Sequence, residues 1–143
     1  MMNRLFLDAN VLFNAAHNPN GKAALVIELG VEGHWELYSS TYALEEARRN
    51  LQRKFPESVS ALAAIESDLN LSLHRAGTPR LAGLADKDQP IFQAALSCNA
   101  THILTGDLRD FGRFMNNSAK THGIRIQTTA EFLEALTSHG DLL

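Results

Sequence analysis

The sequence has little that would cross-link the fold or place it in a membrane. Cys98 is the one cysteine among 143 residues, so no disulfide forms within the chain, and we expect this thiol to be a small buried core residue. No apolar stretch approaches the roughly 20 residues of a membrane span. The first residues lack the apolar segment of a signal peptide. We therefore expect a cytoplasmic protein without membrane association.

Positive charge is also scarce. Thirteen Lys and Arg residues face 16 Asp and Glu residues, and the net charge is −3. This balance excludes a chain that binds nucleic acid through its overall charge. Acids that converge on one cation site would, however, leave the remaining surface more basic than the total suggests.

Several common functional motifs are missing. The six histidines show no paired spacing typical of a zinc site. The sequence has no GxxxxGK[ST] phosphate loop, no GxSxG nucleophile elbow and no GxGxxG dinucleotide motif. Nucleotide hydrolysis, serine esterase chemistry and dinucleotide binding therefore have no support.

The composition is that of one globular α/β domain over residues 1–143. Apolar residues make up 45% and charged residues 20% of the chain, which suits a domain with a sizeable core. Short apolar runs predict strands at 4–7, 35–38, 71–74, 102–105 and 124–127. Apolar residues at helical spacing predict helices over 9–17, 21–33, 42–55, 57–70 and 91–99, a short helix or turn over 107–115, and a last helix from 128. This alternation predicts a parallel sheet with right-handed crossovers.

Two of the predicted strands end on a carboxylate. Asp8 follows the first strand and is itself followed by Asn10, and Asp107 follows the strand that begins at His102. A charge directly after a buried strand loses hydration unless it is paired. Open α/β sheets also place ligands at the carboxyl ends of their strands. These two acids become neighbours if their strands are adjacent.

Further acids begin helices or lie early on them: Glu46, Asp88, Asp86 and Asp110. Taken singly, Asp88 and Asp107 are typical helix caps, and Glu46 is typical of a solvated helix face. Taken together, several carboxylates would repel one another unless hard divalent cations compensate their charge. Oxygen ligands suit Mg²⁺ or Mn²⁺. Such a site can activate water and stabilise the leaving oxygen of a phosphodiester.

The order and spacing of these motifs resemble the PIN-domain family, nucleases that include the toxins of VapBC toxin-antitoxin pairs. Residues 6–12, FLDANVL, resemble the family's opening motif, and residues 40–51, STYALEEARRNL, are similar to its helix with the second acid. Residues 88–95, DQPIFQAA, and 104–107, LTGD, resemble the third and fourth motifs. The resemblance spans nearly the whole chain and implies an α/β/α sandwich with a central, mainly parallel sheet.

The resemblance also assigns roles to single residues. It implies catalytic acids that bind metal at Asp8, Glu46, Asp88 and Asp107. We add Asp110 to the metal ligands because it lies three residues after Asp107 and can face the same site if that segment is helical. Supporting roles are expected for Asn10, Thr105 and Asp86.

The second acid has an alternative on the same helix. On a helical wheel the buried face is defined by Leu44, Ala47, Leu51 and Phe55. Glu45 flanks this face and Glu46 lies nearly opposite, so periodicity alone does not select Glu46. The resemblance selects it. Arg49 and Arg53 share one side of this helix, either as a solvated basic face or as a track for RNA phosphates.

The implied activity is that of a Mg²⁺- or Mn²⁺-dependent endoribonuclease. The family also implies a small antitoxin protein that covers the site, and a homodimer. A non-catalytic RNA-binding PIN module is the alternative, which loss of a motif acid would favour. A phosphatase of the haloacid-dehalogenase kind would need a second acid two residues after Asp8, where this chain has Asn10.

Overall fold

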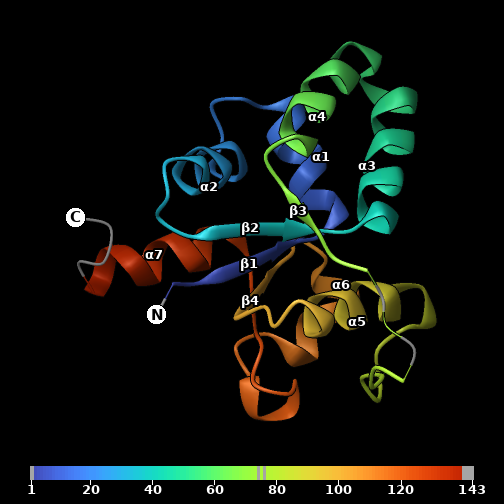
Figure 1. Cartoon of the computed structure of the whole chain (residues 1–143), viewed down its shortest axis with the longest axis vertical. Helices are drawn as coiled ribbons and strands as arrows, with labels where there is room; N and C mark the ends of the chain where they lie inside the picture. Colours follow the sequence, from blue (N-terminus) through green and yellow to red (C-terminus); the bar gives the residue numbers. More distant parts are fainter. Residues whose placement is uncertain (1, 74, 76, 140–143) are drawn as a thin grey trace.

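Five parallel strands form the centre of the fold (Figure 1). The computed structural model describes residues 2–73, 75 and 77–139. The order of strands across the sheet is β3-β2-β1-β4-β5, and every pairing is parallel. Their bounds are β1 Arg4–Leu7, β2 Glu36–Ser39, β3 Asn70–Leu71, β4 His102–Leu104 and β5 Arg125–Gln127. The predicted parallel sheet is confirmed.

Helices cover both faces of this sheet, as the predicted sandwich requires. Figure 1 shows α1 to α4 on one side of the strands and α5 and α6 on the other. The bounds are α1 Ala9–His17, α2 Lys22–Val31, α3 Thr41–Lys54, α4 Val59–Glu66, α5 Gln89–Ser97, α6 Leu108–Phe111 and α7 Thr129–His139. Among the described residues, none of the helices has the length and apolar character needed to cross a membrane.

The core lies on both faces of β1. Leu5, Phe6 and Leu7 are fully buried, which explains why this strand is an uninterrupted apolar run rather than an alternating one. Trp35 is also buried, and its indole N–H donates to the Val26 carbonyl at 2.9 Å. The indole therefore ties α2 to the segment that leads into β2.

The segment before β3 differs from the prediction. The helix expected over 57–70 ends at Glu66, and a short 3-10 turn, Pro56–Ser58, precedes it. Asn70, expected to end that helix, begins β3 because its backbone pairs with Tyr38 and its side-chain amide donates to the Leu37 carbonyl at 3.1 Å. The strand expected at 71–74 is thus shorter and starts earlier. His74 lies outside the described residues.

The strand order reverses between β1 and β4. The chain runs outward from β1 through β2 to β3, then crosses to the other side of β1 through α5 to form β4. A reversal of this kind opens a crevice at the carboxyl ends of the two strands that flank it. The backbone N–H of Asp8 donates to the Leu104 carbonyl at 3.1 Å. The two acid-bearing strand ends are therefore adjacent.

Candidate metal centre

Asp8 is buried where β1 ends and α1 begins. Its Oδ1 accepts the Ala9 backbone N–H at 2.7 Å, and its Oδ2 accepts the Thr105 hydroxyl at 2.8 Å. Burial raises the pKa of this carboxyl, these hydrogen bonds oppose the rise, and the charges of Glu46 and Asp107 add to it. The carboxylate is thus held firmly in a position that disfavours its charge.

Hydrogen bonds tie the loop after β1 to the loop after β4. The Asn10 side-chain oxygen Oδ1 accepts the Gly106 backbone N–H at 2.6 Å, and the Asn10 side-chain amide donates to Asp8 Oδ2 at 3.2 Å. Thr105 Oγ1 also accepts the Asp107 N–H at 3.0 Å. A Cβ atom at Gly106 would lie 3.2 Å from Asn10 Oδ1, so glycine allows this close approach. Asn10 and Thr105 therefore connect the two loops and contact Asp8 directly.

Three carboxylates meet beside this loop. Asp88, Asp107 and Asp110 each offer an oxygen, and the three oxygens lie within 4.8 Å of one another. Asp88 ends the 3-10 turn Asp86–Asp88 at the start of α5, and Asp107 precedes α6. Asp107 Oδ1 accepts the Asp110 backbone N–H at 3.1 Å, which turns Asp110 back toward the group. We name Asp88, Asp107 and Asp110 the acid cluster.

Asp88 is the most buried member of the acid cluster, with 8% of the residue exposed. Its Oδ2 has no hydrogen-bond partner within the described part of the chain. Burial and, to a lesser extent, the contact with Asp110 raise the pKa of this carboxyl to about 7, whereas Lys87 opposes the rise. An oxygen in this state requires a proton or a nearby cation.

The structure distinguishes Glu46 from Glu45. Glu46 is half-buried, and its charge raises the pKa values of Asp8 and Tyr42, so it faces the site. Glu45 is exposed and pairs with Arg48. The helical wheel omitted Ala43, which is fully buried and lies three residues before Glu46. Its burial widens the inner face of α3 toward Glu46.

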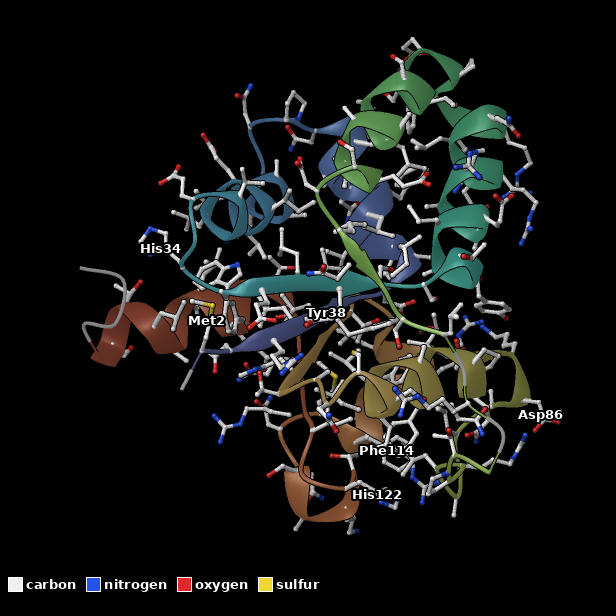
Figure 2. The ribbon with its side chains drawn as sticks, viewed as in Figure 1. Met2, His34, Tyr38, Asp86, Phe114 and His122 are labelled. Atoms are coloured by element: carbon white, nitrogen blue, oxygen red, sulfur yellow. The ribbon has the colours of Figure 1, made fainter. Side chains whose placement is uncertain are left out.

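Asp86 is not brought to the acid cluster. Its side chain is 93% exposed and pairs with Arg80 at 2.5 Å, and Figure 2 shows it at the edge of the molecule. Arg49 and Arg53 are exposed on α3. Arg53 donates to Asn50 Oδ1 at 2.7 Å, and the charge of Arg49 opposes the rise that burial causes in the pKa of Tyr42. Arg49 is thus the one of the two whose charge reaches the rim of the site.

Sequence reasoning missed two residues at this site. The Lys87 ammonium lies 2.7 Å from Asp110 Oδ2 and 3.7 Å from Asp88 Oδ2. The Tyr42 hydroxyl donates to the Lys87 carbonyl at 2.6 Å and so connects α3 to the turn before α5. The sequence signal for Lys87 is its place between two acids, Asp86 and Asp88.

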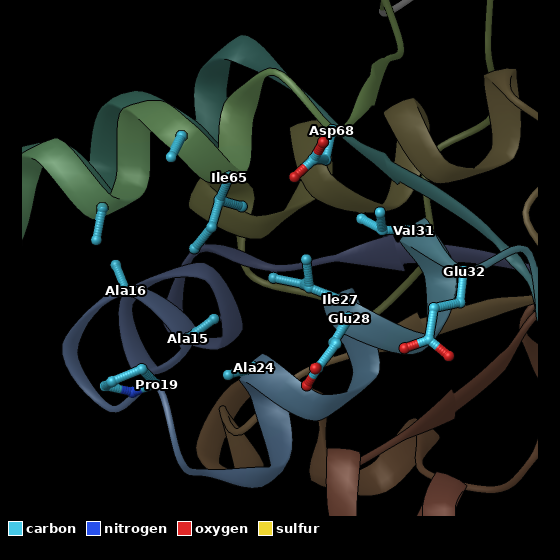
Figure 3. Close-up of a pocket in the computed structure, with 12 residues that line it drawn as sticks. Ala15, Ala16, Pro19, Ala24, Ile27, Glu28, Val31, Glu32, Ile65 and Asp68 are labelled. Carbon is cyan, nitrogen blue, oxygen red and sulfur yellow. The ribbon is translucent and has the colours of Figure 1, made fainter.

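A separate groove of about 540 Å³ lies between α1, α2 and α4. Figure 3 shows Ala15, Ala24, Ile27 and Ile65 along its walls, together with acidic side chains. These acids are Glu28, Glu32 and Asp68. The groove is thus largely apolar with carboxylates among its lining residues.

Comparisons with known proteins agree with this architecture. A family model described as a PIN domain matches residues 4–109. None of the curated protein sequences matches the chain.

Solved structures match over most of the chain at low identity. VapBC2 from Rickettsia felis, bound to a promoter DNA fragment, shares 16% identity with a TM-score of 0.64, covering 87% of this chain and 98% of that one. DNA-bound VapBC from Salmonella typhimurium shares 19% identity with a TM-score of 0.62, covering 90% and 99%. VapBC-1 from nontypeable Haemophilus influenzae shares 17% with a TM-score of 0.56, covering 89% and 98%. These likenesses establish the fold.

Proposed function

Because the chain belongs to the PIN-domain family, whose members are generally nucleases, we propose that it is a metal-dependent endoribonuclease that hydrolyses RNA phosphodiester bonds. The proposed domain spans residues 1–143. The observation that carries the proposal is the buried Asp88 Oδ2, which lacks a hydrogen-bond partner in the described structure and lies beside two further carboxylates. This oxygen and its neighbours form a donor set suited to a hard cation.

The residues present fit Mg²⁺ or Mn²⁺. Asp88, Asp107 and Asp110 would hold the ion through oxygen, and Asp8 and Glu46 add negative charge beside them. A bound ion supplies a Lewis acid that promotes attack by water on phosphorus and stabilises the leaving oxygen.

The protein's own contribution is to fix these carboxylates and bind the substrate. Thr105 and Asn10 hold Asp8 through hydrogen bonds, and the Thr105 hydroxyl also accepts the N–H of Asp107. One hydroxyl therefore positions acids from two strand ends. Arg49 and Arg53 would contact RNA phosphates along α3, where cations bind largely by releasing counterions from the backbone.

A small antitoxin is the proposed protein partner, and a homodimer is part of the same proposal. Three similar folds occur in VapBC complexes, and the groove between α1, α2 and α4 would suit an amphipathic basic helix. Val31, which lines the groove, is 58% exposed. Val31→Lys should weaken binding of an antitoxin encoded by an adjacent reading frame, because it adds a positive charge to a groove lined by carboxylates, while Leu25→Lys on the same helix should not. Equal binding by both variants would rule out the groove as the antitoxin site.

The homodimer is tested separately, by measuring the oligomeric state of the protein by sedimentation.

The activity is tested by RNA cleavage with Mg²⁺ or Mn²⁺. Asp8→Asn and Asp107→Asn should each slow cleavage by at least about a hundredfold. Asp86→Asn is the matched control because this nearby acid is exposed and paired with Arg80. Equal rates for all four proteins would refute the proposed site. RNA binding without cleavage by the parent would instead favour the non-catalytic module.

A further inference from the structure

Lys87 brings a positive charge into the acid cluster. Its ammonium contacts Oδ2 of Asp110 at 2.7 Å and lies 3.7 Å from Oδ2 of Asp88. The second of these atoms is the buried oxygen that lacks a hydrogen bond in the described structure. The cation therefore lies next to the ligand atom that most needs one.

The electrostatics of the cluster depend on this lysine. Three carboxylates whose oxygens lie within 4.8 Å of one another repel strongly when ionised. The Lys87 ammonium contacts carboxylate oxygens of two of these three residues, Asp110 and Asp88. Without metal, Lys87 thus offsets part of the charge that a divalent ion would neutralise.

The lysine and a metal ion would compete for the same oxygens. A Mg²⁺ ion held by the acid cluster would take oxygens that Lys87 contacts, and the ammonium and the ion would repel each other as like charges. The Lys87 backbone is held by Tyr42, but the lysine side chain is 68% exposed. Rotation of a flexible stem into solvent is therefore enough to release the oxygens.

We propose that Lys87 is a tethered cation that holds the acid cluster together in the metal-free protein and that metal must displace. This inference concerns regulation of the proposed metal site and rests on the proposed function. Lys87 then sets the metal affinity: it stabilises the protein without metal and raises the metal concentration needed to load the site.

The test compares Lys87→Gln with the parent in the full chain and without RNA. Mn²⁺ binding is measured by calorimetric titration, and the metal-free melting temperature is measured in EDTA. The variant should bind Mn²⁺ about tenfold more tightly, which is the worth of one charged hydrogen bond, and should melt at a lower temperature without metal. The two changes have opposite signs for a simple reason. The metal-free variant loses a stabilising contact, whereas Mn²⁺ binding to the variant no longer has to displace a competing cation.

Arg80→Gln is the matched control. It removes the same charge from the same segment, but its partner Asp86 is 93% exposed, so neither quantity should change. A second measurement follows the side chain itself in the parent protein. Acylation of Lys87 by an amine-reactive ester, measured by mass spectrometry, should rise when Mg²⁺ is added, whereas acylation of the exposed Lys22 should not.

The outcomes separate this inference from the proposed function. Equal or weaker Mn²⁺ binding by Lys87→Gln, with cleavage by the parent intact, overturns the role of Lys87 and leaves the nuclease proposal standing. Equal effects of Lys87→Gln and Arg80→Gln overturn it as well, since they would reflect overall charge. Failure of the parent to bind Mn²⁺ at all would overturn both proposals.

Discussion

Charged residues are arranged differently at the two ends of the sheet. At the amino ends of the strands, Arg4 donates to the Tyr38 hydroxyl at 2.7 Å, and that hydroxyl donates to Glu36 at 2.7 Å. Arg4 and Glu36 also form an ion pair at 3.7 Å. At the carboxyl ends, acids gather instead: Asp8, Glu46 and the acid cluster. One end pairs unlike charges, and the other concentrates like ones.

This difference separates residues that support folding from residues that fit a function. Each charged residue at the amino ends has a local partner, so a structural role is enough to explain these charges. The carboxyl ends hold Asp8 and Asp88 at raised pKa values, an arrangement that works against the charged form of both residues. Perturbed carboxyls gathered in a crevice are typical of active sites. The most informative tests therefore measure whether substitutions at the carboxyl ends reduce activity without reducing stability, unlike substitutions at the amino ends.

The largest effect is expected for Asp8→Asn. Cleavage should fall by at least about a hundredfold, yet the metal-free free energy of unfolding should not fall by more than about 1 kcal/mol. The reason is that Asn keeps the size of Asp8 and one acceptor oxygen, and the lost acceptor is offset by removing a charge that burial disfavours. RNA cleavage and urea unfolding measure the two quantities. A variant that is inactive because it is unfolded would contradict this prediction.

Thr105→Val should have the next largest effect. The Thr105 hydroxyl is fully buried, donates to Asp8 and accepts the N–H of Asp107. Its loss should lower the free energy of unfolding by about 1–3 kcal/mol and weaken Mn²⁺ binding by at least about tenfold. Urea unfolding and calorimetric titration measure both. Thr105→Ser keeps the hydroxyl and is the control, so equal loss in both variants would argue against the hydrogen bonds.

The pH dependence of stability should have opposite signs at the two ends. At the amino ends, burial and the charge of Arg125 lower the pKa of His102 from 6.5 to about 4. The folded protein keeps His102 neutral, so its contribution to stability is lost as the pH falls from 6.5 toward 4. At the carboxyl ends, the pKa of Asp88 rises from 3.8 to about 7. The folded protein holds that proton, so stability is lost as the pH rises through this window.

Urea unfolding in EDTA between pH 4 and 8 separates these contributions. Asp88→Asn should remove the loss of stability that occurs as the pH rises, and His102→Gln should remove the loss that occurs as the pH falls. Added Mg²⁺ should reduce the loss of stability at rising pH in the parent, because the ion takes the place of the proton. Unchanged slopes in both variants would show that neither group governs the profile.

Local sequence patterns predicted much of the fold because the signals were local. The Ser40 hydroxyl accepts the Ala43 N–H at 3.1 Å and caps the start of α3, close to the start of the helix predicted over 42–55. Thr128 and Glu131 exchange hydrogen bonds at 2.9 and 3.0 Å in a capping box at the start of the helix predicted from 128. The strand predicted at 71–74 was misplaced, because β3 has two residues, Asn70 and Leu71, and is defined by pairing with β2. An edge strand of this kind has no periodicity of its own.

The candidate site was predictable only where strand order governs it. Asp8 and Asp107 follow adjacent strands, so their proximity follows from topology. Lys87 was overlooked because a lysine beside acids is usually solvated, and its contact with Asp110 depends on where α6 begins. The direction in which a single side chain points from a turn thus cannot be predicted from the periodicity of the sequence.

The smallest effect is expected for Asp86→Asn, and this variant sharpens the boundary of the site. Asp86 lies two residues from Asp88 in sequence, yet its 93% exposed side chain pairs with Arg80. Exposed ion pairs contribute little to stability, so cleavage and Mn²⁺ affinity should stay within about twofold of the parent. Parallel assays with Asp110→Asn provide the contrast, since Asp110 belongs to the acid cluster. A larger loss in Asp86→Asn than in Asp110→Asn would move the metal centre toward the turn before α5 and contradict the comparison between the two sheet ends.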